Sequence, residues 1–532
     1  MSLQASLTAI QLEVFRQLFT ALAEEMGAAL KRAAFSPNIK ERRDYSCALF
    51  DSKGLAVSLG DHMPVHLGAM PMSVEAALGE LGTLSPGDVA CLNDPFRGGT
   101  HLPDITLVSP VHWTNGKLLG YVASRAHHSD VGGSTPGSMP LAREVFEEGI
   151  RIPPVLLYSA GHRNDDLWRT LLANVRTPIE RAGDLDAQMA ALNTGAKRLL
   201  EITRRRGIEQ TVSAMDGLIT YADRLVAAGL TLIPDGRYQG EDILEDDGFG
   251  SGPITIRVEL VVQGATLTVN FDGTSAQVPG GVNAVAAITS SATRYVVRCV
   301  VGALLKETLP AGGGSMSSVR LILPEASIVN ASPPAAVAAG NVETSQRITD
   351  VLLQALGAAL PELIPAMSQG TMNNTTVGGE DPRTGKLFAY YETVGGGMGA
   401  GPSGGGLSGV HVHMSNSLNT PIEALEHAYP FRVTSYGIIR GSGGGGLHRG
   451  GDGLRRDLMI LSPAARVTLL CERRKFGPPG AHGGLGGMPG ENILIRDGVE
   501  QTLPAKTTFA ARAGDVVSIR SPGGGGWGPP PD

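Results

Sequence analysis

The stretch NDPFRGGTHLPD, residues 93–104, leads directly into an apolar run at residues 105–111. Pro103 favours an extended conformation at Leu102 and prevents a helix here, so we expect a bent loop that opens a strand. Positions i and i+3 point to opposite faces of a flat strand, but a bend before the strand can bring His101 and Asp104 together around one ion. The alternative is that Asp104 caps a turn and His101 lies on the surface.

A second stretch, SRAHHSDVGG at residues 124–133, ends the strand expected at 118–124. Neighbouring strand residues face opposite ways, so only one of His127 and His128 can reach a given site. The other would orient a substrate or support a ligand from behind. Imidazole and carboxylate side chains are the usual ligands of Zn, Mn and Fe(II). The alternative is a pair of loop histidines without a metal.

Other acidic and imidazole side chains lie near these stretches. Asp44 begins an early strand, where a salt bridge with a neighbouring arginine is the simpler interpretation. Asp61, His62 and His66 are further candidates, although Pro64 makes a packed turn just as reasonable there.

Periodicity gives the remaining elements. Helices are expected at residues 7–34, 71–82, 162–177, 183–229, 281–306 and 344–360. Strands are expected at 45–50, 55–59, 89–92, 105–111, 118–124, 254–262 and 265–271, with short strands after about residue 365. Gly207 is a weak point in the long helix, which forms a helical hairpin of the kind that packs on a sheet or mediates dimerisation.

Glycine is the unusual component, with 72 of 532 residues crowded into the second half. Because glycine adopts positive φ and allows close backbone approach, we interpret its clusters as tight turns between short strands. The predicted fold is α+β and multi-domain, with mixed sheets, a long helical hairpin and a Gly-rich, β-rich C-terminal half. Its expected regions are 1–160 (the α/β metal-site region), 161–235 (a helical arm), 236–365 (α+β) and 366–532 (Gly-rich and β-rich).

Composition excludes several classes of function. The formal net charge of -7 and the absence of a basic stripe argue against a nucleic-acid partner. Four widely spaced cysteines fit a reducing compartment, and with no signal peptide or long apolar run we expect a cytoplasmic protein that does not enter membranes. There is no P-loop, so the chain is not expected to bind ATP by itself. There is also no nucleophile elbow of the serine-hydrolase type.

These motifs together resemble the hydantoinase B/oxoprolinase family over nearly the whole chain. The resemblance rests on FSPNIKERRDYS at residues 35–46, the two stretches above, PGSMP at 136–140, GNVETSQR at 340–347, TPIEALE at 420–426 and RGG at 449–451. The 93–104 stretch is the most specific of them.

The resemblance implies a divalent metal, with Zn first and Mn or Fe as alternatives. Its ligands would be Asp44, His101, Asp104 and His127, with His128 as the alternative to His127. It also implies a separate A-type subunit that binds ATP and phosphorylates a cyclic amide, in a hetero-oligomer with two copies of each subunit. This chain would then open the ring of the activated amide.

Within that scheme, His128 or Asp130 is expected to move protons, and Glu343, Arg347, Asn374 and Glu423 are weaker pocket candidates. Two other functions remain open. The chain could be a subunit of an ATP-dependent ketone carboxylase, or a non-catalytic scaffold for the A subunit.

Overall fold

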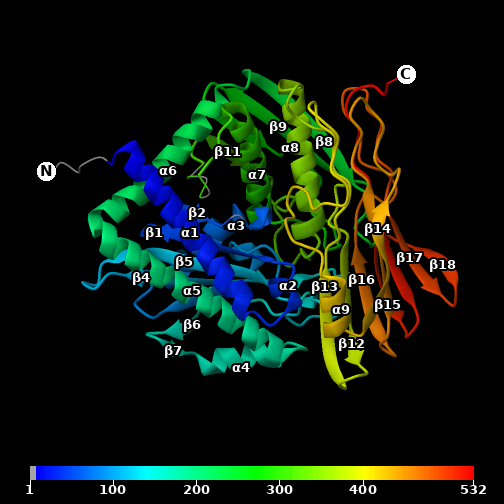
Figure 1. Ribbon diagram of the computed structural model, residues 1–532, viewed down its shortest axis with the longest axis horizontal. Helices are drawn as coiled ribbons and strands as arrows, with labels where there is room; N and C mark the ends of the chain where they lie inside the picture. The colour runs from blue at the N-terminus through cyan, green and yellow to red at the C-terminus, as the bar shows by residue number, and fades with distance from the viewer. Residues whose placement is uncertain (1–6, 61, 311, 313, 315, 532) are drawn as a thin grey trace.

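The computed structural model describes residues 7–60, 62–310, 312, 314 and 316–531. Within these residues it forms a mixed α+β fold with four sheets (Figure 1). This confirms the predicted fold class. None of the described helices is both long and apolar enough to cross a lipid bilayer. The division into the four regions 1–160, 161–235, 236–365 and 366–532 stays a prediction.

The first sheet has seven strands in the order β2-β1-β5-β4-β3-β6-β7. They are β1 (Tyr45–Asp51), β2 (Ala56–Leu59), β3 (Val89–Leu92), β4 (Asp104–His112), β5 (Leu118–His127), β6 (Val155–Ser159) and β7 (His162–Arg163). Helices α1 (Ala9–Ala33) and α5 (Pro178–Arg206) cover one face, and α3 (Ala69–Leu81) covers the other. The alternation of side chains shows this: Leu49 packs with the α1 core, whereas Phe50 packs with the α3 core. Both faces are buried, so β1 is buried along its whole length.

The helical arm differs from the prediction in three respects. The single helix expected over 183–229 is two helices, α5 and α6 (Ile208–Leu230), which meet at Gly207. Gly207 has a φ of 89°, which L-residues with a side chain rarely adopt, so the backbone turns there. α5 lies along α1 and on β4 and β5 and has much less contact with α6, so the two helices do not pair side by side as the expected hairpin (Figure 1). The helix expected at 162–177 is shorter, as α4 (Asp165–Ala173), and its first residues form β7.

The middle of the chain forms a four-stranded sheet that carries two helices. Its strands are β8 (Gly236–Leu244), β9 (Ile254–Gln263), β10 (Thr266–Asn270) and β11 (Val319–Ile322). Helix α8 (Ser345–Ala359) packs on β8 and β9 and against α7 (Ala286–Leu305). One π-helical turn, η4 (Gly340–Thr344), leads into α8.

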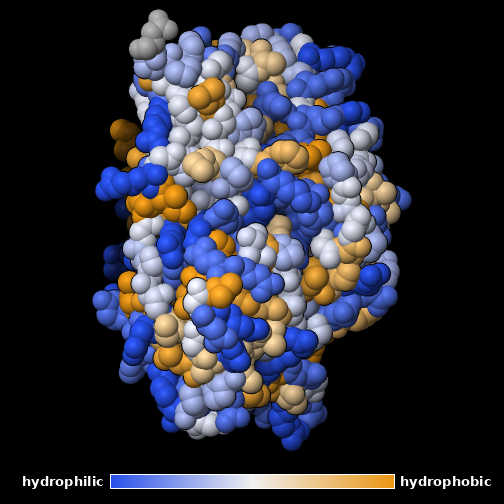
Figure 2. Space-filling model, turned by 90° about the vertical axis from the view of Figure 1, so that its right-hand side faces the viewer, coloured by the Kyte–Doolittle hydropathy of each residue, from blue (hydrophilic) through white to orange (hydrophobic). Residues whose placement is uncertain are grey.

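The C-terminal part contains two sheets that share a second core. One is β13 (Lys386–Glu392), β12 (Asn374–Asp381), β16 (Ala465–Leu470) and β19 (Lys506–Ala511). The other is β14 (Phe431–Ile439), β15 (Gly453–Ile460), β20 (Val516–Arg520), β17 (Glu491–Arg496) and β18 (Val499–Leu503). The short helix α9 (Ile422–Ala428) precedes β14. Figure 2 views the molecule from this side, where polar residues are interspersed with smaller apolar groups.

Three of the glycine clusters are not the tight turns that we expected, whereas the fourth, at 483–487, begins in a turn at Gly483, whose φ is 88°. In the runs 395–399, 443–446 and 523–526 no glycine has a positive φ. The runs are extended and lie backbone against backbone, with Gly444 donating to the Gly524 carbonyl at 2.9 Å and Gly524 donating to that of Gly451 at 2.9 Å. A Cβ on Gly524 would lie 2.1 Å from the Met398 carbonyl oxygen. The clusters therefore form a glycine layer, in which close approach rather than positive φ requires glycine.

Candidate metal centre

Three of the four predicted ligands converge inside the molecule. Ligand atoms of His101, Asp104 and His127 all lie within 4.8 Å of one another, and all three residues are buried. His101 Nε2 is 3.3 Å from Asp104 Oδ2, and His127 Nδ1 is 3.4 Å from Asp104 Oδ1. The two imidazoles approach each other at 3.2 Å between His101 Nε2 and His127 Nδ1.

Local structure explains the convergence. Asp104 is the first residue of β4 and His127 is the last residue of β5, and the antiparallel register places them directly opposite each other. The loop before β4 is bent as expected: the Asp104 amide donates to the His101 carbonyl at 3.1 Å. The bend turns His101 toward the side of the sheet that Asp104 faces.

The protonation states suit a cation. Burial alone would raise the pKa of Asp104, but the neighbouring imidazoles of His101, His127 and His66 outweigh it and hold this pKa well below its usual range. Burial lowers the pKa of His127, which favours its neutral form. Metal ligands must be an ionised carboxylate and neutral imidazoles. Asp104 Oδ1 is also buried without a hydrogen-bond partner among the described residues. The two nitrogens and the carboxylate therefore fit a divalent ion.

Asp44 lies in the same cavity but outside this three-residue cluster. It lines the cavity together with Asp104 and His127, and its carbonyl accepts the His127 amide at 3.0 Å. The expected salt bridge is a loose one, because Asp44 Oδ2 is 4.0 Å from Arg42 Nη1. Its role as a fourth ligand stays a prediction.

The tandem histidines divide as strand geometry requires. His127 faces the cavity, whereas His128 Nε2 lies 3.0 Å from Gln188 Oε1 on α5, and burial lowers the His128 pKa to about 4. Asp130 is engaged by Arg176, whose Nη1 is 2.8 Å from Asp130 Oδ1. Neither His128 nor Asp130 lines the cavity. Their proton-transfer role stays a prediction that their position does not support.

Of the neighbouring candidates, one histidine reaches the cavity. His66 Nε2 is 3.4 Å from Asp104 Oδ2, and His66 Nδ1 is 2.8 Å from the Ser46 hydroxyl. His62 lies instead beside Tyr45 and Glu24, with Nε2 3.7 Å from the Glu24 carboxylate. Asp61 lies outside the described residues.

The opposite wall comes from the C-terminal half, and no local sequence pattern predicts that it lies here. The Tyr391 ring stacks on His127, with centroids 4.2 Å apart and planes 15° apart. Its hydroxyl donates to Asn374 Oδ1 at 3.0 Å, and Asn374 Nδ2 donates to Glu343 Oε1 at 2.7 Å. Two of the weaker pocket candidates, Glu343 and Asn374, thus lie behind Tyr391 rather than in the cavity itself.

Hydroxyl groups complete this wall. Thr393, Ser415 and Ser417 line the cavity. The fully buried Arg42 donates to Thr393 Oγ1 at 2.6 Å and to Ser417 Oγ at 3.2 Å. Since both oxygens accept from a guanidinium, their own hydrogens are directed elsewhere. One of these bridges the pair, whose oxygens are 3.0 Å apart, and the other can be donated to Ser415 Oγ, which lies 3.5 Å from Ser417 Oγ, or to a group in the cavity.

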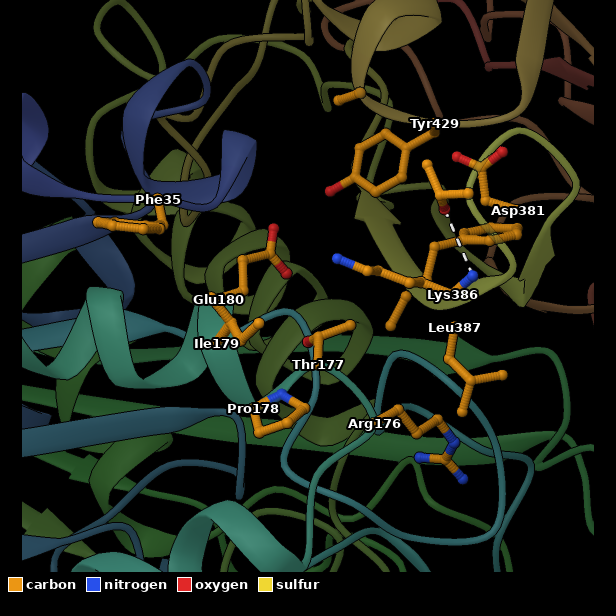
Figure 3. Close-up of a pocket in the computed structure, with 14 residues that line it drawn as sticks. Phe35, Arg176, Thr177, Pro178, Ile179, Glu180, Asp381, Lys386, Leu387 and Tyr429 are labelled. Carbon is orange, nitrogen blue, oxygen red and sulfur yellow. Dashed lines mark hydrogen bonds between the residues drawn. The ribbon is translucent and has the colours of Figure 1, made fainter.

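A larger pocket lies on the surface, where the start of α5 faces β13 (Figure 3). Its volume is about 540 Å³ and its apolar lining includes Phe35, Ile179 and Leu387. The Glu180 carboxylate and the Lys386 side-chain nitrogen point into it from opposite walls. No histidine is among its described lining residues, so we place the chemistry in the smaller cavity. The two share β13, because Ala389 lines the pocket and Tyr391 lines the cavity.

A buried carboxyl group supports the backbone behind His101. Glu148 Oε1 accepts the amides of Val337 and Ala338 at 2.7 and 2.8 Å, and the Ala338 carbonyl lies 3.4 Å from His101 Nδ1. Burial raises the pKa of Glu148 from 4.5 to about 8. Because the folded-state pKa exceeds the unfolded one, the wild-type protein loses this contribution to stability as pH rises through that interval.

We therefore expect Glu148→Gln, which does not titrate, to gain in melting temperature relative to wild type as pH increases. Thermal unfolding of the two proteins at pH about 5.5 and about 9 measures this difference. A difference that is the same at both pH values would contradict the raised pKa of Glu148.

Comparison with known proteins identifies the family of the chain. The model of the hydantoinase B/oxoprolinase family matches residues 8–530. The chain is 38% identical to 5-oxoprolinase 1 of Arabidopsis thaliana over 98% of its own length, and it spans 42% of that longer protein. It is 32% identical to caprolactamase subunit beta of Pseudomonas jessenii, covering 98% of this chain and 91% of that subunit.

Two solved structures share the fold. The ATP-dependent caprolactamase from Pseudomonas jessenii matches with a TM-score of 0.89 and 29% identity, over 98% of this chain and 92% of that one. An acetone carboxylase matches with a TM-score of 0.84 and 18% identity, over 98% and 75% of the two chains, and this likeness concerns the fold alone. With a family model that spans almost every residue, the chain belongs to the hydantoinase B/oxoprolinase family.

Proposed function

We propose that this chain is the metal-binding subunit of an ATP-dependent cyclic amide hydrolase, which opens a hydantoin, oxoproline or lactam ring. One observation carries the proposal: His101, Asp104 and His127 converge inside the protein, at a cavity lined by Asp104 and His127, in a chain whose relatives include a 5-oxoprolinase and a caprolactamase subunit. The finer parts of the proposal are the metal, the activated substrate and the partner.

The chemistry requires two kinds of activation. An amide is a poor electrophile because resonance gives its C–N bond partial double-bond character, and phosphorylation of the amide oxygen by a partner would remove that resonance. Addition of water to the carbon and cleavage of the C–N bond, with a proton delivered to the nitrogen, would then open the ring to an acyl phosphate, and a second water would release the phosphate. A divalent metal, when bound, supplies Lewis acidity and lowers the pKa of water. His101, Asp104 and His127 would hold the ion, with Asp44 as a fourth ligand.

In a cavity of about 10 Å³, which has room for about one ion or water molecule, the remaining lining residues would contact only the reacting group of a substrate. Tyr391 closes one side through its stack on His127. The hydroxyls of Thr393 and Ser417, with Arg42 behind them, present a hydrogen-bond donor near a buried positive charge. Such a wall stabilises negative charge on a substrate oxygen.

The ATP-binding function would belong to a second polypeptide. The sequence contains no P-loop, the Arabidopsis 5-oxoprolinase is more than twice as long as the part matched, and the Pseudomonas relative is named as one subunit of a caprolactamase. We propose an A-type ATP-binding partner in a hetero-oligomer with two copies of each chain, located in the cytoplasm.

The hydrolase is favoured over the two alternatives. Both relatives named above with at least 30% identity are hydrolases of cyclic amides by name, whereas the acetone carboxylase is 18% identical. A scaffold without catalysis would have no need for two buried imidazoles against a buried carboxylate.

The test combines this chain with its ATP-binding partner and offers hydantoin, 5-oxoproline and caprolactam in turn. We expect one cyclic amide to accelerate ATP hydrolysis, with ring-opened product formed without bicarbonate and with one divalent metal bound per chain. A requirement for bicarbonate and a ketone would instead identify a carboxylase. Full activity of metal-free protein would remove the metal from the proposal.

A further inference from the structure

A fourth polar side chain meets the His–Asp cluster, and it comes from the π-helical turn η4. Asn341 is 5% exposed, and its Nδ2 lies 3.1 Å from His101 Nε2. Its Oδ1 is buried and has no hydrogen-bond partner among the described residues. A buried amide oxygen without a partner is unfavourable unless something else uses it.

His101 Nε2 is the atom on which these groups converge. Asp104 Oδ2 lies 3.3 Å from it, His127 Nδ1 3.2 Å and Asn341 Nδ2 3.1 Å. The Ala338 carbonyl is 3.4 Å from Nδ1 on the other side of the ring, a position that favours a proton on Nδ1 and a lone pair on Nε2. A cation bound at Nε2 would take this lone pair and deprive the Asn341 amide nitrogen of its acceptor.

The amide group can respond by rotating about its terminal torsion, which is broad and roughly two-fold. Oxygen and nitrogen of a carboxamide occupy nearly equivalent positions, so the rotation would bring Oδ1 to the point that Nδ2 occupies, beside the cation. This would also give the unpartnered oxygen an interaction. We propose that Asn341 is an additional metal ligand, whose amide oxygen joins His101, Asp104 and His127; this rests on the metal site of the proposed function.

The turn that carries Asn341 holds it firmly. The Gly340 amide donates to the Gly281 carbonyl at 3.0 Å, and a Cβ on Gly340 would lie 1.8 Å from the Asn283 carbonyl oxygen. The Thr344 hydroxyl donates to the Val282 carbonyl. Single π-helical turns of this kind occur frequently at functional sites. The amide therefore has little freedom except rotation of its end group.

An amide oxygen is a hard donor and raises the number of ligands. Structural zinc sites have four ligands, and catalytic zinc sites have three protein ligands and an open position, whereas carbonyl and carboxylate oxygens suit Mn²⁺ and similar ions in higher coordination. With Asp44 as the fourth ligand of the proposed function, Asn341 would be the fifth, so the proposal predicts a coordination number above four.

Cobalt(II) is the probe, because its visible absorption is weak in five- or six-coordinate sites and intense in tetrahedral ones. Metal-free wild-type protein, Asn341→Leu and Asn341→Asp would be titrated with Co²⁺, with Asn416→Leu as a matched control. Asn416 lies near the cavity, but its amide donates to the His62 carbonyl.

We expect Asn341→Leu to bind Co²⁺ at least about 10-fold more weakly and with more intense absorption than wild type. Asn341→Asp, which retains an oxygen donor, should restore the affinity, and Asn416→Leu should match wild type. Equal affinity and an equal spectrum for wild type and Asn341→Leu would overturn the role of Asn341 and leave the metal site in place. Failure of wild-type protein to bind Co²⁺, Mn²⁺ or Zn²⁺ would overturn the metal site itself.

Discussion

Asp104→Asn is expected to abolish stoichiometric metal binding and to reduce ring opening by more than the roughly 10–100-fold that loss of an outer-shell partner causes. Asp104 is the central carboxylate of the cluster, because His66, His101 and His127 each place a nitrogen within 3.4 Å of one of its oxygens. The asparagine has the same shape but lacks the negative charge that offsets a cation's charge in a buried site. Its amide group would also direct a hydrogen-bond donor toward the imidazoles.

Metal analysis of purified protein and turnover with the ATP-binding partner measure the two effects. Thermal unfolding of metal-free protein should show that the variant folds, since the substitution changes no volume. His162→Ala, on the exposed strand β7, is the control and should match wild type in both measurements. An Asp104→Asn variant that retains a full complement of metal would rule out this carboxylate as a ligand.

Gly524→Ala is expected to prevent folding, with a loss of more than about 4 kcal/mol in the free energy of unfolding. The added methyl group would lie 2.1 Å from the Met398 carbonyl oxygen and 2.3 Å from its carbon. These are backbone atoms, and Met398 is itself fixed, because its amide donates to Leu407 and its carbonyl accepts from Gly451, both at 2.9 Å. The glycine layer has no flexible side chain there that can move aside.

Gly404→Ala is the matched control from the same region. A Cβ on Gly404 meets no atom within 4 Å, and its φ is not positive. Soluble yield and the midpoint of thermal unfolding should therefore be near wild type for Gly404→Ala and much lower for Gly524→Ala. Similar midpoints for the two variants would show that the backbone segments of the glycine layer can move apart to accommodate a methyl group.

The local sequence pattern predicts those helices, strands and bends that depend on residues close together in the sequence. The helices at α1, α3, α7 and α8 and the strands β1 to β5 of the first sheet follow from periodicity, whereas β6 and β7 do not. Pro103 predicted the bend that brings His101 beside Asp104. The rule of alternating faces predicted that one of His127 and His128 would turn away. These inferences depend on residues that are close in sequence.

Where the prediction failed or was silent, the cause lies in tertiary contacts. Nothing near Tyr391 indicates that it stacks on His127, 264 residues earlier (391 − 127), and the same holds for Asn341 beside His101. Composition alone does not distinguish positive φ from close packing, and for this reason it predicts turns where the glycine clusters form a packed layer. In the long helical segment, Gly207 indicates a weak point, but the break depends on how α5 and α6 pack on the rest of the molecule.

The opposed positions of Asp104 and His127 on neighbouring strands have a consequence for insertions and deletions. Removing one residue from the middle of β5 would advance the chain by one place and put His128 opposite Asp104, so that an imidazole would still fill that position. The same shift would turn side chains of β5 to the opposite face of the sheet. Val122 and Ala123, for example, face different cores in the native register. A one-residue shift in the register of β5 would thus keep an imidazole opposite Asp104 but disrupt the packing of both cores. The β4–β5 hairpin should therefore tolerate changes of length in its connecting loop, residues 113–117, far better than within its strands.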